Sequence, residues 1–361
     1  MKEIKVNLKE NSYRVIIGTG ILDNLGVYLK RLNIGTGAYI ITNSSLKSLF
    51  GENVNKPLFK SGFTFYYKLV PDSEKSKSFS VAGRILSDLS AYGRKRKLFI
   101  LALGGGVIGD LAGFVASIYR RGIPYIQIPT SLLAQVDSSI GGKTAVDLNC
   151  GKNLVGTFYQ PKLVLSDIGL LRVLPSRQLK SALAEVIKYA VIGDRELFIY
   201  LENNLSGILA KNETCLEYIV ARCAGIKAGI VSRDEKEKKG IRVILNFGHT
   251  LGHAIEAAGN FKAYNHGEAV GLGMLAACGI SRRMNLLKES HCQRIEDLIK
   301  RAGIPTRIKG LEIKKIIGAH YHDKKFNGAM NKFVLLKKIG KSTVMDNIPL
   351  KIIKEALKKR F

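Results

Sequence analysis

Short apolar runs alternate with amphipathic stretches along the first half of the chain. The ranges 14–18 and 38–42 are rich in β-branched residues, which is typical of strands, whereas 43–50 and 78–93 have the polar and apolar spacing of helices. Residues 98–103 form a continuous apolar run, which predicts a strand buried on both faces. Strands that alternate with helices favour a parallel sheet with helices packed on it.

From about residue 170 the pattern changes to long helical periods, and β-branched alternation returns only at 332–336. Helices are predicted over 176–192, 196–210, 213–231, 268–285 and 290–302. We therefore expect two domains: an α/β N-terminal Rossmann-like nucleotide-binding domain over 1–168, and a mainly α-helical C-terminal domain over 169–361.

Composition and charge narrow the class of protein. Of the 361 residues 46% are hydrophobic, and no apolar run is long enough to predict a membrane span. The N-terminus lacks the apolar core of an export signal, so we expect a cytoplasmic protein. The five cysteines form no C-x-x-C pair. The net charge of +28 suggests nucleic-acid binding as one function. However, the basic residues are spread along the chain and form no nucleic-acid-binding motif, so attraction of an anionic substrate explains the charge better.

The stretch that begins at Arg242 carries three of the six histidines, His249, His253 and His266. The pattern predicts a helix here, with His249 and His253 four residues apart and therefore on one face. Asn246 and Arg242 extend the same polar stripe towards the N-terminus. Burying such a stripe is costly without ligands or partners, so the stretch is a candidate metal and substrate site.

A carboxylate that could complete this site lies in another predicted helix. Glu185 and Lys188 are three residues apart in an otherwise apolar segment. With His249 and His266, Glu185 would form a two-histidine, one-carboxylate set, which suits zinc with an open position. The spacing alone favours His249 and His253 as a ligand pair. The residues by themselves leave both pairings open.

A glycine-rich segment, 104–110, follows the apolar strand and precedes a predicted helix over 111–119. It matches the G-x-G-x-x-G pattern in the required context, in which glycines let the backbone approach a pyrophosphate at a helix N-terminus. The acidic residue expected about 20 positions later is absent. A dinucleotide site is favoured over a plain tight turn, although this pattern alone does not decide it.

Two lysines follow in segments that are dense in glycines and small polar residues, Lys143 in G-G-K-T and Lys152 in G-K-N. The first segment lacks the spacing of a P-loop, because no glycine stands five residues before Gly142. Lysines framed by glycines in loops fit the recognition of phosphate or carboxylate groups as point charges. The alternative is an exposed glycine-rich connection without a ligand.

Together these blocks resemble the 3-dehydroquinate synthase family over nearly the full chain. The matching blocks are PDSEKSKS at 71–78, GGGVIGD at 104–110, YRRGIP at 119–124, PTSLLAQVDSSIGGKT at 129–144, GKN at 151–153, AEVIK at 184–188, LNFGHTLGHAIE at 245–256, HGEAV at 266–270 and DKK at 323–325. The resemblance implies a homodimeric enzyme of the shikimate pathway that uses NAD and one divalent metal ion, zinc or alternatively cobalt. It implies the conversion of 3-deoxy-D-arabino-heptulosonate 7-phosphate into 3-dehydroquinate and phosphate, by transient oxidation, phosphate elimination, re-reduction and ring closure.

The resemblance also implies roles, carried over by position. The metal ligands are Glu185, His249 and His266. The substrate-binding residues are Arg121, Lys143, Lys152, Asn153, Lys188, Arg242, Asn246, His253, Lys324 and Lys325, of which Lys143, Lys188, Arg242, Asn246 and His253 are also catalytic. The cofactor-binding residues are Glu74, Lys77, Gly105, Gly106, Val107, Asp110, Thr130, Ser131, Asp137, Ser138, Lys143 and Lys152. His253 would handle protons, Arg121 would reach the substrate phosphate from a neighbouring subunit, and one of the two late lysines would close over the substrate carboxylate.

Three positions depart from the family pattern. Before Arg242 the chain has one residue more than is usual, so the acidic residue of the family falls on Glu237 or is replaced by Lys238. Val173 stands where a threonine is common, and Asn43 where an aspartate is common. We expect these changes to affect affinity more than the type of reaction.

Rival functions remain at this stage. One is another sugar-phosphate cyclase, acting on sedoheptulose 7-phosphate, glucose 6-phosphate or an amino analogue. Asn153 and the D-K-K block argue against this rival, because they favour a substrate with a carboxylate. Another is a polyol dehydrogenase of related fold, which would release NADH. A basic nucleic-acid-binding protein has no need for the histidine and lysine sets.

Overall fold

The computed structural model describes residues 1–93, 97–148, 151–322 and 331–361, with the backbone alone at 321 and 322. The chain forms two compact units, Met1–Leu174 with Leu216–Lys236, and Pro175–Cys215 with Glu237–Phe361. This division differs from the expected domains, 1–168 and 169–361, chiefly because most of helix α7 (Glu213–Arg233) packs with the first unit. In that helix Lys227 bonds to Asp137, a contact between distant parts of the chain that a local pattern cannot predict.

Seven strands of the first unit form one sheet in the order β1-β2-β9-β6-β5-β3-β4. β1 is antiparallel to β2, and every other neighbouring pair is parallel. The strands are β1 (Lys2–Val6), β2 (Tyr13–Gly18), β3 (Gly37–Thr42), β4 (Thr64–Leu69), β5 (Leu98–Gly104), β6 (Tyr125–Pro129) and β9 (Leu163–Asp167). The predicted parallel sheet is confirmed.

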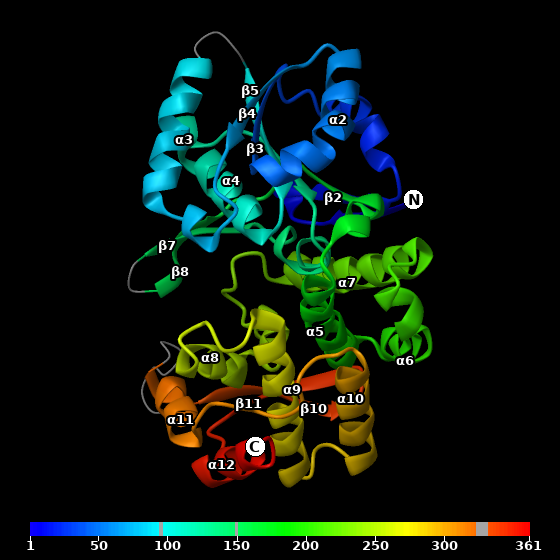
Figure 1. Ribbon diagram of the computed structural model, residues 1–361, viewed down its shortest axis with the longest axis vertical. Helices are drawn as coiled ribbons and strands as arrows, with labels where there is room; N and C mark the ends of the chain where they lie inside the picture. The colour runs from blue at the N-terminus through cyan, green and yellow to red at the C-terminus, as the bar shows by residue number, and fades with distance from the viewer. Residues whose placement is uncertain (94–96, 149–150, 323–330) are drawn as a thin grey trace. The chain divides into compact units, whose positions relative to one another are not determined.

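Helices cover both faces of this sheet, with α2 on one face and α3 and α4 on the other (Figure 1). The helices are α1 (Leu25–Leu32), α2 (Ser44–Lys60), α3 (Phe79–Tyr92) and α4 (Gly106–Ile118). Along β5, Leu101 packs into the core on the α1–α2 side and Ile100 into the core on the α3–α4 side. Every residue of β5 is buried, so the prediction of a strand buried on both faces is confirmed.

Two further strands, β7 (Lys143–Leu148) and β8 (Gly151–Phe158), form an antiparallel ribbon. The prediction of loops around Lys143 and Lys152 was therefore wrong. Gly156 of β8 allows the two strands to pair closely, since a Cβ there would lie 2.0 Å from the carbonyl oxygen of Thr144. The short elements of this unit are η1 (Lys9–Asn11), η2 (Ile21–Asn24), η3 (Glu74–Ser76), η4 (Tyr119–Arg121), the π-helix η5 (Ala134–Ser138) and η6 (Ile168–Val173).

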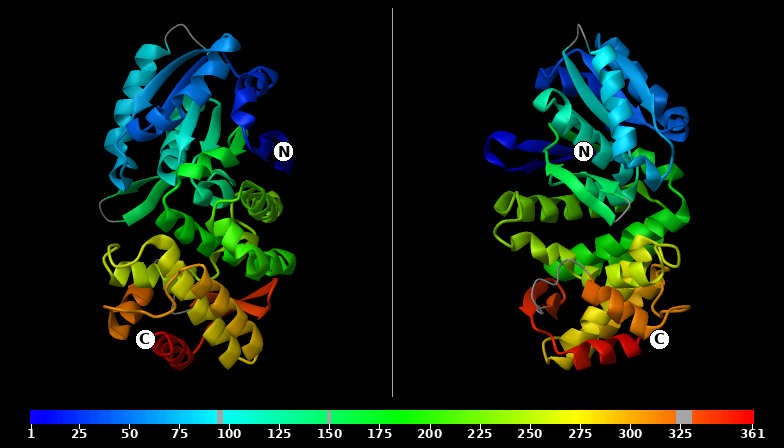
Figure 2. Two further views of the ribbon diagram at one scale, coloured as in Figure 1. Left: turned by 45° about the vertical axis from the view of Figure 1, so that its right-hand side comes forward. Right: turned by 90° about the vertical axis from the view of Figure 1, so that its left-hand side faces the viewer.

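The second unit is mainly helical, as predicted. Its elements are α5 (Ser176–Gly193), α6 (Arg195–Leu209), η7 (Ile241–Asn246), α8 (His249–Ala258), α9 (His266–Arg283), α10 (Glu289–Arg301), α11 (Ile313–His322), β10 (Lys332–Lys338), β11 (Lys341–Asp346) and α12 (Leu350–Lys358). Helix α9, yellow in Figure 2, is central to the unit because it contacts α5, α8, α10, α12 and β10. The five long helices predicted after residue 170 are confirmed, with ends within two residues. No helix in the described part of the chain is long and apolar enough to cross a membrane.

Candidate active-site residues

Glu185, His249 and His266 meet inside the second unit. Glu185 lies on α5 with 1% of its side chain exposed, and His249 and His266 are the first residues of α8 and α9. The Nε2 atoms of His249 and His266 lie 3.4 and 3.6 Å from the same atom, Glu185 Oε1. Ligand atoms of the three residues all lie within 4.8 Å of one another. The structure thus brings together the three ligands that the resemblance implies.

The docking of α9 on α5 places His266 beside Glu185. Asn265 caps α9 by accepting from the backbone N–H of Glu268, and the Glu268 carboxylate accepts from the Asn265 N–H in return. The Ser181 hydroxyl, one turn before Glu185, donates to Asn265 Oδ1 and accepts from the Gly267 N–H. The start of α9 is therefore attached to α5 close to the carboxylate.

The predicted helix through Arg242, Asn246 and His249 was wrong. Arg242 and Asn246 lie in the 3₁₀-helix η7, and the chain leaves helical geometry at Phe247 before α8 begins at His249. Gly248 has a φ of +80°, which favours glycine, and a Cβ there would also meet Met274 Cγ at 2.5 Å. Close packing of α8 on α9 thus forces a break that helical periodicity cannot show.

The donor set fits a divalent cation. The Glu185 carboxylate is buried and forms an ion pair with Lys188, yet the described residues supply no hydrogen bond of good geometry to either of its oxygens. Ligand atoms of a tetrahedral zinc ion, each about 2.0–2.2 Å from the metal, lie about 3.4 Å from one another. The two Nε2–Oε1 separations match that spacing and exceed a charge-assisted hydrogen bond of about 2.8 Å.

The two imidazoles are in different electrostatic states. Burial lowers the pKa of His249 to about 3, so its ring is neutral at neutral pH and can act as a ligand. Burial also lowers the pKa of His266, but the carboxylates of Glu185 and Glu256 outweigh it and raise that pKa to about 10. Burial raises the pKa of Glu185, while Lys188 and the two histidines outweigh it, so the carboxyl stays ionised.

Other predicted residues of the second unit surround this cluster. The His253 ring lies 5.4 Å from that of His249 and 6.3 Å from that of His266, measured between centroids. Lys188 is 2% exposed and lies over the ring of Tyr189. The predicted roles of these side chains stay predictions.

The extra residue before Arg242 places an acidic partner beside it. Glu237 adopts a left-handed φ of +56°, and its Oε1 lies 3.3 Å from Nε of the buried Arg242. Of the two possibilities raised by the sequence, the acidic position therefore falls on Glu237 rather than on Lys238.

In the first unit five of the predicted cofactor residues, Gly105, Gly106, Thr130, Ser131 and Ser138, lie close together beyond the carboxyl ends of β5 and β6. Gly104 pairs with Pro129, and the Thr130 N–H donates to the Gly104 carbonyl at 3.1 Å. Cβ atoms placed at Gly105 and Gly106 would lie 3.4 Å from Ser131 Oγ and 3.2 Å from Ser138 Oγ. Ligands of open α/β sheets bind at this edge of the strands.

Helix α4 begins at Gly106, five residues before the predicted start, so Val107 and Asp110 belong to its first turns. A buried polar group lies beside it. Lys77, 5% exposed, pairs with Asp110 Oδ2 at 2.5 Å and also contacts the side-chain oxygen of Asn153. Burial raises the pKa of Asp110 although Lys77 opposes it. Lys77 thus contacts two other predicted site residues, Asp110 and Asn153.

The predicted lysines of the ribbon are exposed. Lys143 is the first residue of β7. On β8, Nζ of Lys152 lies 3.5 Å from Oε1 of Glu74, a predicted cofactor residue. Arg121 is exposed with a left-handed φ of +63°, next to Arg120 at +49°. Lys324 and Lys325 lie outside the described residues.

Lys227 was missed by sequence reasoning. It is 6% exposed, and its Nζ donates to the backbone oxygen of Asp137 at 2.7 Å and to Asp137 Oδ1 at 2.6 Å. Lys227 therefore holds the π-helix that carries two predicted cofactor residues, Asp137 and Ser138. A lysine within the largely apolar run 219–231 was the available signal.

The structure shows the surroundings of Asn43 and Val173, the other two positions that depart from the family pattern. Asn43 is 3% exposed and caps α2, where its Oδ1 accepts from the Leu46 N–H at 2.8 Å. Val173 is 51% exposed at the end of η6. The structure gives Asn43 a role in helix capping, and the expected effects on affinity stay predictions.

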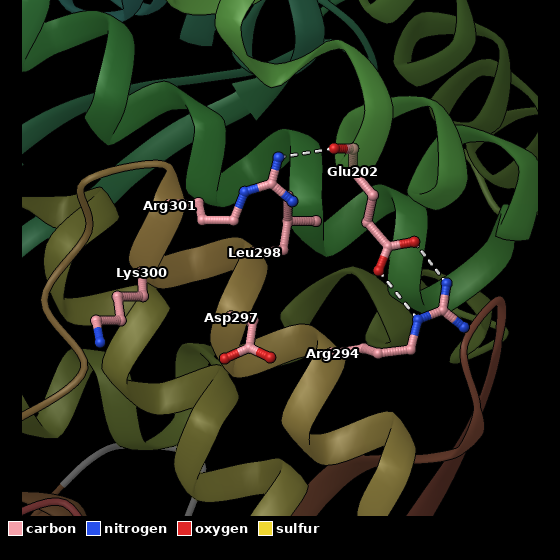
Figure 3. Close-up of a pocket in the computed structure, with 6 residues that line it drawn as sticks. All are labelled: Glu202, Arg294, Asp297, Leu298, Lys300 and Arg301. Atoms are coloured by element: carbon pink, nitrogen blue, oxygen red, sulfur yellow. Dashed lines mark hydrogen bonds and ion pairs between the residues drawn. The ribbon is translucent and has the colours of Figure 1, made fainter.

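A separate hollow of about 620 Å³ lies between α6 and α10 (Figure 3). Its lining residues are Glu202, Arg294, Asp297, Leu298, Lys300 and Arg301. Arg294 binds both carboxylate oxygens of Glu202, at 3.0 and 2.5 Å, and Arg301 donates to the Glu202 backbone oxygen at 2.8 Å. The arginines are therefore already paired, and none of the predicted site residues lines this hollow.

The chain matches two family models, 3-dehydroquinate synthase N-terminal over residues 67–181 and 3-dehydroquinate synthase C-terminal over residues 182–326. A 3-dehydroquinate synthase from Pelotomaculum thermopropionicum is 44% identical over 358 residues, which are 99% of this chain and 96% of the relative. The chain belongs to the 3-dehydroquinate synthase family. The predicted family is thereby confirmed.

Two solved structures of similar proteins share the fold over nearly their whole length. One is 2-deoxy-scyllo-inosose synthase complexed with carbaglucose-6-phosphate, NAD+ and Co2+, which is 27% identical with a TM-score of 0.90 over 100% of both chains. The other is 2-epi-5-epi-valiolone synthase from Streptomyces hygroscopicus with NAD+ and Zn2+ bound, 27% identical with a TM-score of 0.88 over 98% of this chain and 97% of that one. Both confirm the predicted fold class.

Proposed function

We propose that this chain converts 3-deoxy-D-arabino-heptulosonate 7-phosphate into 3-dehydroquinate and phosphate, with NAD and one divalent metal ion as cofactors. The observation that carries the proposal is the buried set Glu185, His249 and His266 in a member of the 3-dehydroquinate synthase family. The two similar synthases, whose structures contain NAD+ with Co2+ or Zn2+, support this pair of cofactors.

The chain's own residues suit an anionic substrate at a metal centre. Glu185, His249 and His266 would hold the metal ion, which would act as a Lewis acid on a substrate hydroxyl while NAD accepts and later returns a hydride. Lys188 and Arg242 are cations with 2% and 3% exposure, so water screens their charges little when they bind a phosphate or a carboxylate. His253 would move a proton at the reacting hydroxyl.

The first unit would hold the cofactor at the edge formed by β5 and β6. Gly105 and Gly106 leave space for a pyrophosphate next to the N-terminus of the 13-residue helix α4. Ser131 and Ser138 lie against these glycines and would donate hydroxyl protons to phosphate oxygens. Lys77, paired with Asp110, would fix the position of that part of the site.

The proposed function is tested by phosphate release. Protein loaded with zinc and supplied with NAD should release phosphate from the heptulosonate phosphate, lose this activity on chelation and regain it with zinc or cobalt, without net NADH. No release from the metal-replete protein would reject the proposal. Turnover of glucose 6-phosphate or sedoheptulose 7-phosphate instead would indicate a different cyclase, and NADH accumulation with a polyol would indicate a dehydrogenase.

A further inference from the structure

His266 has a carboxylate beside each ring nitrogen. Its Nε2 lies 3.6 Å from Glu185 Oε1, and its Nδ1 lies 3.5 Å from Glu256 Oε2. The Glu256 side chain is 13% exposed, whereas 38% of the His266 side chain is exposed. The described residues thus give His266 a second carboxylate contact that the proposed function does not use.

His249 has the same arrangement with a different oxygen. Its Nδ1 lies 3.1 Å from the backbone oxygen of Phe247, and its Nε2 lies 3.4 Å from Glu185 Oε1. Each imidazole is therefore held at Nδ1 by an oxygen and presents Nε2 to the same carboxylate atom. A neutral imidazole with its N–H at Nδ1 has its lone pair at Nε2, where a metal ion can bind.

We propose that Glu256 is a positioning residue for the metal centre: its carboxylate accepts the Nδ1–H of His266 and so holds the Nε2 lone pair towards Glu185. The inference rests on the proposed metal site, but it concerns a residue outside the ligand set. Helix α8 would then serve the centre twice, with His249 as a ligand and Glu256, seven residues later and on the same face, as the support of the other histidine.

The same atoms allow one competing use. His253, Glu256 and His266 form a second group whose ligand atoms lie within 4.8 Å of one another, so they could hold a second cation. That use would require His266 to bind metal ions through both ring nitrogens and so to lose its last ring proton. A neutral imidazole keeps one N–H, which Glu256 can accept without that cost. The geometry therefore favours the positioning role.

The test measures metal affinity, which is separate from turnover. Glu256→Ala should weaken zinc binding about 10- to 100-fold in competition with a chromophoric chelator, the range typical for loss of a group that supports a ligand. Glu256→Gln, which has nearly the same shape and keeps an oxygen acceptor, should recover part of that loss. The cobalt-loaded alanine variant should also show a changed visible absorption spectrum, because the ring of His266 would be free to turn.

Glu52→Ala is the matched control. Glu52 is a 74% exposed glutamate on α2 that pairs with Lys56 and is none of the predicted site residues, so zinc affinity should be unchanged. Melting temperatures of all variants in chelator would separate a folding defect from a metal-binding defect.

Three outcomes would overturn the inference. The first is that both Glu256 variants keep the zinc affinity and the cobalt spectrum of the wild type. The second is that the wild type binds two metal equivalents and Glu256→Ala abolishes only the second. The third is that the wild type binds no metal. If the wild type binds one equivalent tightly and Glu256→Ala weakens it, but no phosphate is released, the proposed reaction fails and the positioning role stands.

Discussion

A Cβ atom at Gly267 would lie 1.9 Å from the carbonyl oxygen of Ser181. The first turn of α9 therefore contacts α5 so closely that only glycine fits, and this contact places His266 within reach of Glu185. Because the obstacle is backbone and not a flexible side chain, an added methyl group must push the two helices apart.

Gly267→Ala should weaken zinc binding about tenfold, the lower end of the range for loss of support to a metal ligand, and should lower the melting temperature of the chelated protein. Metal affinity and thermal unfolding measure the two effects. Gly229→Ala is the matched control, because Gly229 lies inside α7 with no atom near its Cβ position, and replacing a helical glycine there should stabilise the protein by about 0.5–1 kcal/mol. Wild-type affinity in the Gly267 variant would contradict this account of the contact.

His266 and His253 should respond differently to removal. His266→Ala and Glu185→Ala should lose bound metal, because each removes one of three clustered ligand atoms. His253→Ala should keep one equivalent and lose turnover, since its proposed role is proton transfer. Metal content by elemental analysis and phosphate release measure the two properties. Wild-type metal content in the His266 variant would show that the ligand set is wrong.

The contact between Glu237 and Arg242 predicts an effect on substrate binding. Glu237→Ala should raise the KM for the heptulosonate phosphate about fivefold, because the variant removes this ion pair from the buried Arg242 and an ion pair with a part-exposed partner contributes up to about 1 kcal/mol. Steady-state kinetics measure the change. Lys238→Ala, one position later, should leave KM unchanged, and an equal effect of both variants would reject a specific role for Glu237.

His291 makes stability depend on pH. Burial, together with the charges of Arg294, Lys288, Arg195 and Lys338, lowers the pKa of His291 below its ordinary value of 6.5. The unfolded chain then binds the proton more readily, so the contribution of His291 to stability is present above pH 6.5 and is lost as the pH falls towards the folded-state pKa.

His291→Gln should therefore become more stable relative to the wild type between pH 7.5 and pH 5. Urea unfolding of both proteins, with chelator present, measures the difference in free energy of unfolding at each pH. The buried Nδ1 of His291 has no hydrogen-bond partner among the described residues, which also disfavours a proton there. A pH-independent difference between the two proteins would contradict the prediction.

Local pattern alone predicted much of the fold. The run 98–103 specified β5, because a strand covered by helices on both sides must be apolar at every position. The long helices after residue 170 followed from their periodicity in the same way. The resemblance, carried by ordered blocks, also nominated Glu185, His249 and His266 before any geometry was known.

Tertiary structure decided what spacing left open. His249 and His253 share a helical face, so their spacing in the sequence does not determine which of the two directs its Nε2 towards Glu185, next to His266. That choice depends on Gly267 meeting Ser181 and on the break at Gly248, both of which are close approaches between segments far apart in the chain. The contacts of Lys227 with Asp137 and of Glu256 with His266 escape sequence reading for the same reason. Periodicity reports the neighbours of a residue along one element, whereas a site is made by contacts between elements.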